Sequence, residues 1–100
     1  MTLREKQSKF VRMVSALIDF AYEQGYELTF GDTYAKSGHT GNSLHYIRLA
    51  ADFNLFKDGK YLTETVDHQE LGEFWESIGG SWGGRFGDGN HYSLEHNGRR

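Results

Sequence analysis

The chain contains no cysteine among its 100 residues. A disulfide framework and a thiolate metal site are therefore both excluded. The length predicts a single domain over residues 1–100, and a domain this small buries a smaller fraction of its surface than a large one. If a metal adds stability to such a fold, histidine and carboxylate side chains must hold it. The five histidines and the 14 acidic residues are therefore the side chains to place first.

Composition excludes two classes of partner. A formal net charge of −3 gives no clustered basic surface of the kind that binds nucleic acid. No run of about 18 apolar residues is present, so no segment is predicted to insert into a membrane. Hydrophobic residues make up 37% of the chain and aromatic residues 15%, which is enough for a compact core.

Hydrophobic periodicity predicts the N-terminal half of the fold. A helix is predicted over residues 3–24, because six apolar residues recur at helical spacing: Phe10, Val11, Val14, Leu17, Ile18 and Ala21. Thr2 and Glu5 fit a capping box, and Gly25 fits the helix end. Apolar and polar residues then alternate over 26–30, which predicts a half-buried strand. Residues 31–42 are predicted to form a loop.

The C-terminal half predicts a small sheet and a second helix. The predicted elements are a strand over 49–56, a hairpin turn at Asp58-Gly59, a return strand at 61–62, a helix over 67–78, a glycine-rich segment without regular structure over 81–90, and a strand over 91–95. The predicted fold class is therefore α+β, with helices packed on a small, mainly antiparallel sheet.

Two short motifs carry the chemistry. His45 and Asp52 lie seven residues apart, and Asp88 precedes His91 by three. Together they offer two imidazoles and a carboxylate as ligands, with a second carboxylate nearby, which is the inventory of a catalytic zinc site. Zinc activates water and polarises a carbonyl, and a neighbouring carboxylate can act as general base. On spacing alone, a lone His–Asp pair is more often a surface or structural hydrogen bond than a metal site, and the second motif is what favours the metal.

The separation of His45 and Asp52 constrains the backbone between them. Residues 45 and 52 differ by an odd number, so on one straight strand their side chains would face opposite sides. They converge only if the chain turns or bulges, and residues 46–48 are where we expect this. Asp52 also lies in an apolar setting, where a carboxylate is costly unless it is paired or coordinated.

The two motifs resemble a known metal motif. Ser43-x-His45 … Ala50-x-Asp52 followed by Asp88-x-x-His91 is similar to that of the D-alanyl-D-alanine carboxypeptidase and L-alanyl-D-glutamate endopeptidase family of zinc peptidases. This family belongs to the superfamily of D-Ala-D-Ala peptidases and the hedgehog domain. The segment Trp82-Gly83-Gly84-Arg85-Phe86 resembles the family's approach to its last motif.

The resemblance implies a role for each motif residue. His45, Asp52 and His91 would bind one zinc ion in a surface cleft, Asp88 would be the general base, and Ser43 would lie at the substrate end. The family usually has glycine three residues after the first histidine, where this chain has Arg48. An upstream arginine commonly binds substrate carboxylate, and we expect Lys36 to replace it and Arg85 to contribute.

The resemblance also implies a function, the cleavage of peptidoglycan stem peptides as an L-alanyl-D-glutamate endopeptidase or a D-Ala-D-Ala carboxypeptidase. The chain looks like phage endolysins, which implies phage-induced lysis. We expect a monomer, made in the host cytoplasm without a signal peptide and acting on the cell wall after release by a holin-like partner. One alternative is a non-catalytic phage structural or wall-binding module with a structural zinc, which would have no use for Asp88. Another is a zinc amidase, which the resemblance to peptidases disfavours.

Other conspicuous side chains are predicted to be structural. His39 is expected in a solvated loop, His68 on the polar part of the second helix, and His96 in the C-terminal tail. Trp82 fits core packing and a substrate-groove wall equally well.

Overall fold

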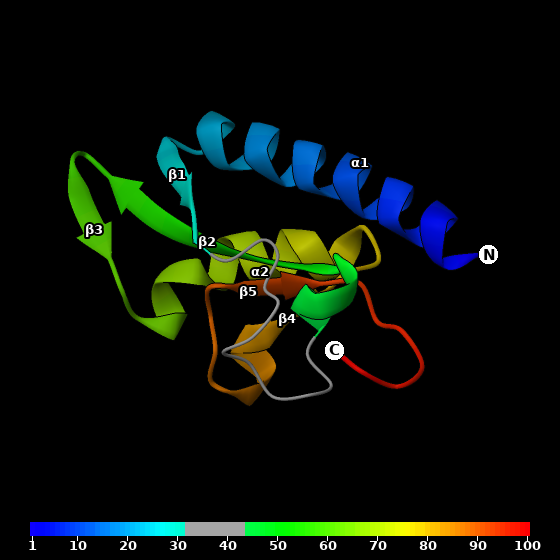
Figure 1. The fold of residues 1–100 in the computed structure, drawn as a ribbon. Helices are drawn as coiled ribbons and strands as arrows, with labels where there is room; N and C mark the ends of the chain where they lie inside the picture. The colour runs from blue at the N-terminus through cyan, green and yellow to red at the C-terminus, as the bar shows by residue number, and fades with distance from the viewer. Residues whose placement is uncertain (32–43) are drawn as a thin grey trace.

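The fold is α+β, as the sequence predicts. A computed structural model describes residues 1–31 and 44–100. Its elements are α1 (Leu3–Glu23), β1 (Tyr26–Phe30), the 3-10 helix η1 (Leu44–Ile47), β2 (Ala50–Lys57), β3 (Lys60–Leu62), the 3-10 helix η2 (Thr65–His68), α2 (Gln69–Ser77), β4 (Ser81–Trp82), the 3-10 helix η3 (Gly83–Phe86) and β5 (His91–Ser93). Figure 1 shows α1 running along one side of the molecule above the strands.

Helix α1 begins at the predicted capping box. Glu5 N donates to Thr2 Oγ1 at 3.1 Å, and Thr2 N donates to Glu5 Oε1 at 2.9 Å. Its buried residues are Phe10, Met13, Leu17 and Ala21. Val11 was predicted in this stripe but is 67% exposed, so that assignment is wrong. The buried positions are spaced three or four residues apart, as one helical face requires.

The strands form one antiparallel sheet around β2. The order is β1-β2-β5-β4, and β3 also pairs with β2. The first half of β2 pairs with β5, and its second half pairs with β1 and β3. The predicted turn at Asp58-Gly59 is confirmed, with φ of 52° and 77°, as a two-residue hairpin turn with both central residues at positive φ requires.

The two faces of the sheet have different roles. Tyr92 contacts Trp75 of α2 and Phe53 of β2, with ring centroids 5.9 Å apart in both pairs. Trp75 Nε1 also donates to Ser93 O at 2.8 Å. Side chains alternate along a strand, so Asp52 and His91, the immediate neighbours of Phe53 and Tyr92, point to the opposite face. The hydrophobic core therefore lies on the α2 side, and two candidate ligands lie on the other.

The segment over 81–90 contains regular structure, contrary to prediction. Ser81 and Trp82 form β4 opposite Ser93 and Tyr92 of β5, and η3 follows. Trp82 is 3% exposed and its Nε1 donates to Gly89 O at 2.7 Å, so it is a core residue. A Cβ at Gly83 would collide with the Asp88 carbonyl oxygen and with His91 Cβ. This glycine therefore permits close packing beneath His91.

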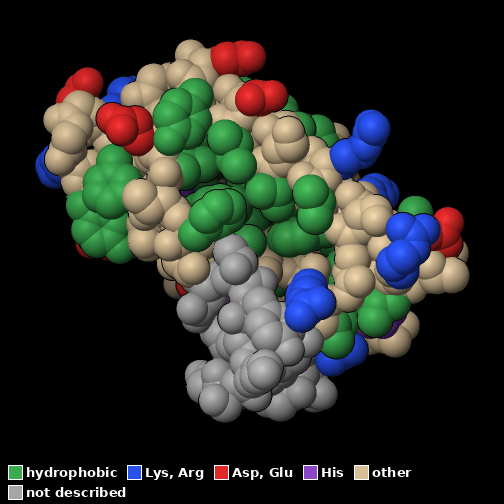
Figure 2. All heavy atoms as spheres, turned by 45° about the horizontal axis from the view of Figure 1, so that its top comes forward, with side chains coloured by type: hydrophobic (Ala, Val, Ile, Leu, Met, Phe, Trp, Pro, Cys, Tyr) green, Lys and Arg blue, Asp and Glu red, His purple; other side chains and the backbone are tan. Residues whose placement is uncertain are grey.

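An apolar pocket lies on the α1 side of the molecule. Hydrophobic side chains gather over the middle of the face in Figure 2. The pocket is lined by Ile18, Tyr22, Leu28, Thr29, Phe30 and Phe53. None of these side chains is a metal ligand or carries a charge at neutral pH, so candidate chemistry must be sought elsewhere. Among the described residues, no helix is long and apolar enough to cross a membrane.

Candidate metal centre

The 3-10 helix η1 and a turn bring His45 beside β2. Leu44 and Leu49 are buried on either side of the turn, and Leu49 N donates to Leu44 O at 3.0 Å. Arg48 reverses the chain with φ of 59°, and Arg48 N donates to His45 O at 3.3 Å. Figure 1 shows η1, in green, beside the start of β2. The predicted turn between His45 and Asp52 is therefore confirmed.

Strand register brings His91 to Asp52. The two residues are directly paired between β2 and β5. His91 Nδ1 and His45 Nε2 each lie 3.2 Å from Asp52 Oδ1, and the three ligand atoms all lie within 4.8 Å of one another. His45 is 2% exposed and His91 is 7% exposed. The three predicted ligands thus converge from η1, β2 and β5.

The geometry fits a zinc ion. Zinc binds histidine nitrogen and carboxylate oxygen at about 2.0–2.2 Å, so neighbouring ligand atoms of a tetrahedral site lie about 3.4 Å apart. Both distances from Asp52 Oδ1 to the imidazole nitrogens are close to this spacing. Three protein ligands is also the number that catalytic zinc sites use. The residues present therefore fit the metal that the sequence motifs imply.

Electrostatics keep the Asp52 carboxylate ionised. Burial by itself raises the pKa of this group, but hydrogen bonds and charge from His45 and His91 outweigh burial and lower the pKa to about 2. An anionic oxygen is thus available to a cation at any physiological pH. The His91 ring also contacts Phe86, with centroids 5.8 Å apart, and its Nε2 is buried without a hydrogen-bond partner among residues 1–31 and 44–100.

Asp88 is held in the same turn as His91. Asp88 N donates to Gly83 O at 2.9 Å, and His91 N donates to Asp88 O at 3.1 Å. Gly87, with φ of 83°, ends η3 and leads into this turn. The Asp88 side chain is exposed. The Asp88 backbone is therefore fixed relative to His91, while its carboxylate is exposed to solvent. Its role as general base stays a prediction.

The other predicted site residues are placed less directly. Arg85 makes two hydrogen bonds to the Glu76 carboxylate, at 2.7 and 2.8 Å, and lies over the Trp82 ring at 5.3 Å. Its contact with substrate stays a prediction. Ser43, Lys36 and His39 lie outside the described residues, as does the predicted loop apart from Gly31.

His68 is buried, so its predicted place on a polar helix face is wrong. It is 3% exposed, and its Nδ1 lies 2.8 Å from the Tyr92 hydroxyl oxygen. The sequence pattern assumed α-helical spacing from residue 67, but residues 65–68 form a 3-10 helix with about three residues per turn. The different period turns His68 inward.

Sequence reasoning also overlooked two amides beside the ligands. Asn54 lies two residues after Asp52, and Asn90 immediately precedes His91. Both are half-buried. The signal that could have identified them is position: residue i+2 on a strand shares a face with residue i, so Asn54 lies on the same face as a ligand.

The stability of the fold at acid pH is expected to depend on the titration of His68. Burial lowers the pKa of His68 to about 4, and the charge of Asp67 offsets only part of this. Because the folded pKa lies below the ordinary value, the unfolded chain binds a proton first, and stability falls as pH drops from about 6.5 towards 4. The slope reaches at most about 1.4 kcal/mol per pH unit. Urea unfolding of the wild type and His68→Gln across this range should show that the free energy of unfolding depends less steeply on pH in the variant. Equal slopes for the two proteins would contradict this role of His68.

Arg48 is expected to lower the free energy of unfolding, because its backbone lies in the left-handed region. A non-glycine residue in the left-handed region is disfavoured by about 1–2 kcal/mol, and glycine's extra freedom in the unfolded chain cancels part of that gain. We therefore expect Arg48→Gly to raise the free energy of unfolding by about 0.5–1 kcal/mol in urea titrations. Arg48→Ala is the matched control, because it removes the side chain and keeps the strain. A rise in both variants would assign the effect to the side chain.

Comparison with known proteins agrees with the site. Two histidines and one aspartate converging on a single point define the class, a protein with the ligand set of a mononuclear zinc enzyme. The family model described as D-alanyl-D-alanine carboxypeptidase matches residues 37–94, more than half of the chain and the part that contains His45, Asp52, Asp88 and His91. The chain therefore belongs to this family of zinc peptidases, which confirms the family resemblance. A search of curated proteins gave no match.

Proposed function

We propose that the chain hydrolyses peptide bonds in the stem peptides of peptidoglycan, as an L-alanyl-D-glutamate endopeptidase or a D-Ala-D-Ala carboxypeptidase. The observation that carries this proposal is the convergence of His45, Asp52 and His91 within 4.8 Å, with Asp88 held in the same turn as His91. We propose a peptide bond as the target because the matched family model is described as a D-alanyl-D-alanine carboxypeptidase.

Each residue has a defined task in this proposal. Nε2 of His45, Oδ1 of Asp52 and Nδ1 of His91 would hold one zinc ion. When bound, the ion would supply a Lewis acid that polarises a peptide carbonyl and activates water at neutral pH. Asp88 accepts the proton of the attacking water and returns it to the leaving amine. The nearly complete burial of both imidazoles keeps competing water away from the ligands.

We further propose that this activity serves phage-induced lysis of bacteria. The support is the resemblance of the chain to phage endolysins. On this proposal the protein acts as a monomer on the cell wall, and a holin-like partner releases it from the host cytoplasm.

The alternative is a wall-binding or structural module in which the metal only stabilises the fold. One observation favours it: the three ligands come from three separate elements, so an ion there would join η1, β2 and β5. A purely structural site does not need Asp88. The activity of Asp88 variants therefore separates the two functions.

Metal analysis and wall digestion test the proposal together. Elemental analysis should give about one zinc per chain, and mass spectrometry of digested wall peptides should show chelator-sensitive cleavage. The masses of the fragments identify the bond. Zinc without cleavage would favour the structural module, and a chain that binds no zinc would contradict the site.

A further inference from the structure

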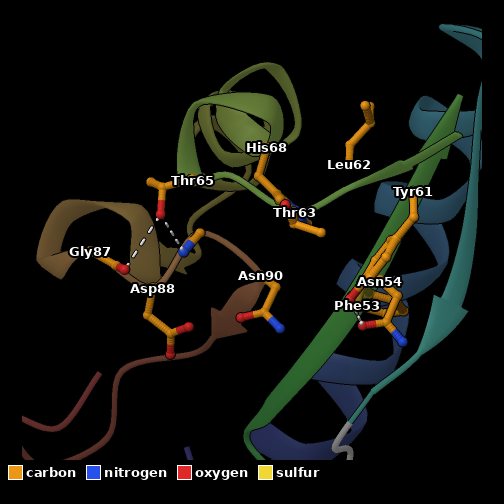
Figure 3. A pocket seen from close by; sticks show the side chains of 11 residues that line it. Phe53, Asn54, Tyr61, Leu62, Thr63, Thr65, His68, Gly87, Asp88 and Asn90 are labelled. Atoms are coloured by element: carbon orange, nitrogen blue, oxygen red, sulfur yellow. Dashed lines mark hydrogen bonds between the residues drawn. The ribbon is translucent and has the colours of Figure 1, made fainter.

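A second pocket, of about 170 Å³, adjoins the metal centre. Figure 3 shows that it lies between the segment after β3 and the turn that contains Asp88 and Asn90. The side chains that matter below are Phe53, Asn54, Tyr61, Thr65, His68 and Asn90. No metal ligand lines it, so it is distinct from the site of the ion.

The pocket stands at a defined distance from the metal ligands. Asn54 shares a face of β2 with Asp52, two residues or about 7 Å away. On the adjoining chain, Asn90 precedes His91, and Phe53 N donates to Asn90 O at 2.9 Å. An extended peptide advances about 3.3–3.6 Å per residue. A substrate with its scissile bond at the metal therefore reaches this pocket about two residues away.

The described residues that line the pocket are mostly polar, and Asp88 is the one among them that carries a charge at neutral pH. Within residues 1–31 and 44–100, no Lys or Arg lines it. A carboxylate or phosphate would therefore find no cationic partner. Burial lowers the pKa of His68 to about 4, so this ring is neutral at physiological pH. In Figure 3 the Asp88 carboxylate points away from Thr65 and His68. The pocket thus suits a neutral group.

Hydrogen bonds fix two sides of the pocket in advance. Asn54 Oδ1 accepts from the Tyr61 hydroxyl at 3.4 Å, and Asn54 Nδ2 donates to Thr29 Oγ1 at 3.2 Å. Across the pocket, Thr65 Oγ1 accepts from Gly89 N at 3.2 Å and donates to Gly87 O at 3.4 Å, as the dashed lines of Figure 3 show. The walls therefore need little reorganisation when a ligand binds.

Asn90 is the side chain left to bind. It is half-buried, and within the described part of the chain nothing hydrogen-bonds its amide group. In the view of Figure 3 this amide lies between Asp88 and Asn54. A side-chain amide offers two N–H donors and a carbonyl acceptor in one plane. Another carboxamide satisfies this donor and acceptor together, in the same plane.

We propose that this pocket is a substrate subsite for a carboxamide group about two residues from the scissile bond, with Asn90 as its direct partner. The proposal rests on the proposed function. In peptidoglycan the same chemistry comes from two sources, an amidated carboxyl of the stem peptide or the acetamido group of a wall sugar. The Tyr61 ring, which is 53% exposed, supplies the apolar contact that either group needs beside its polar atoms.

The test compares four substrates cleaved by the zinc-loaded protein. They are stem peptides with the D-glutamyl α-carboxyl free or amidated, each with or without an N-acetylmuramyl group. We expect kcat/KM to favour one carboxamide-bearing substrate by about tenfold, the worth of a buried hydrogen bond. Preference for amidation identifies the stem peptide as the source, and preference for the sugar identifies the acetamido group. Equal values for all four would overturn the subsite.

Variants assign the preference to Asn90. In Asn90→Ala the preference should fall towards one, whereas Gln24→Ala, which removes an exposed carboxamide at the end of α1, should keep it. Both variants should bind one zinc per chain. A preference that survives in Asn90→Ala would overturn the assignment of Asn90.

A binding measurement separates this subsite from the proposed activity. N-acetylglucosamine and D-isoglutamine are titrated into 15N-labelled, zinc-loaded wild type. One of them should shift the Asn90 side-chain NH2 resonances in a saturable way, whether or not any substrate is cleaved. No cleavage of any substrate would contradict the peptidase, while unshifted Asn90 resonances with both probes would overturn the subsite.

Discussion

Asp88→Ala is expected to retain zinc and to lose nearly all turnover. The side chain is not among the three converging ligands, and it is exposed, so its removal should leave the metal and the fold in place. A general base contributes about 10²–10⁴-fold, and kcat should fall by that factor. Asp88→Asn should be equally slow, because an amide of the same shape cannot accept the proton. Metal analysis and the rate of stem-peptide cleavage are measured on the same samples.

Two comparisons make the Asp88 result specific. His91→Ala removes a candidate ligand and should lose both zinc and activity. Asp19→Ala removes an exposed carboxylate from α1 and should change neither. Full activity in Asp88→Ala would exclude Asp88 from the mechanism. Loss of zinc in that variant would instead make Asp88 part of the metal site.

Local signals predicted much of the fold. The capping box at Thr2 and Glu5 and the turn at Asp58-Gly59 depend on residues next to one another in sequence, and both form as expected. Strand β4 was missed because it contains two residues and exists only through pairing with β5. Glycine enrichment over 81–90 suggested irregular backbone, but Gly83 serves close packing under His91. Such tertiary causes leave no periodic signal.

The candidate site divides in the same way. The motifs named His45, Asp52 and His91, and the odd spacing of the first two predicted the turn that Arg48 makes. The register that sets Asp52 opposite His91 joins residues 39 positions apart, which no local pattern specifies. His68 was misplaced because a 3-10 turn changes the helical period. The pocket beside the ligands depends both on the register between β2 and β5 and on the 3-10 turn that places His68.

Zinc is expected to stabilise the fold strongly, in addition to its proposed role in catalysis. Its ligands come from η1, β2 and β5, and the unfolded chain does not bring these together. At a free metal concentration 1,000 times the dissociation constant, binding adds about 4 kcal/mol to the free energy of unfolding. For a chain of this size each kcal/mol raises Tm by about 4–8 °C, so zinc should raise Tm by at least about 15 °C. Thermal unfolding with zinc and with chelator measures the difference.

Asp52→Asn tests whether this stabilisation arises at the proposed site. The substitution keeps the shape of the side chain but replaces the anionic oxygen, which lies 3.2 Å from both imidazole nitrogens, with a neutral amide. Zinc prefers the carboxylate, so the rise in Tm should shrink to a few degrees. Asp19→Asn makes the same chemical change on the exposed face of α1 and should keep the full rise. Mg²⁺ should not replace zinc, because it selects oxygen ligands. An undiminished zinc effect in Asp52→Asn would place the stabilising ion elsewhere.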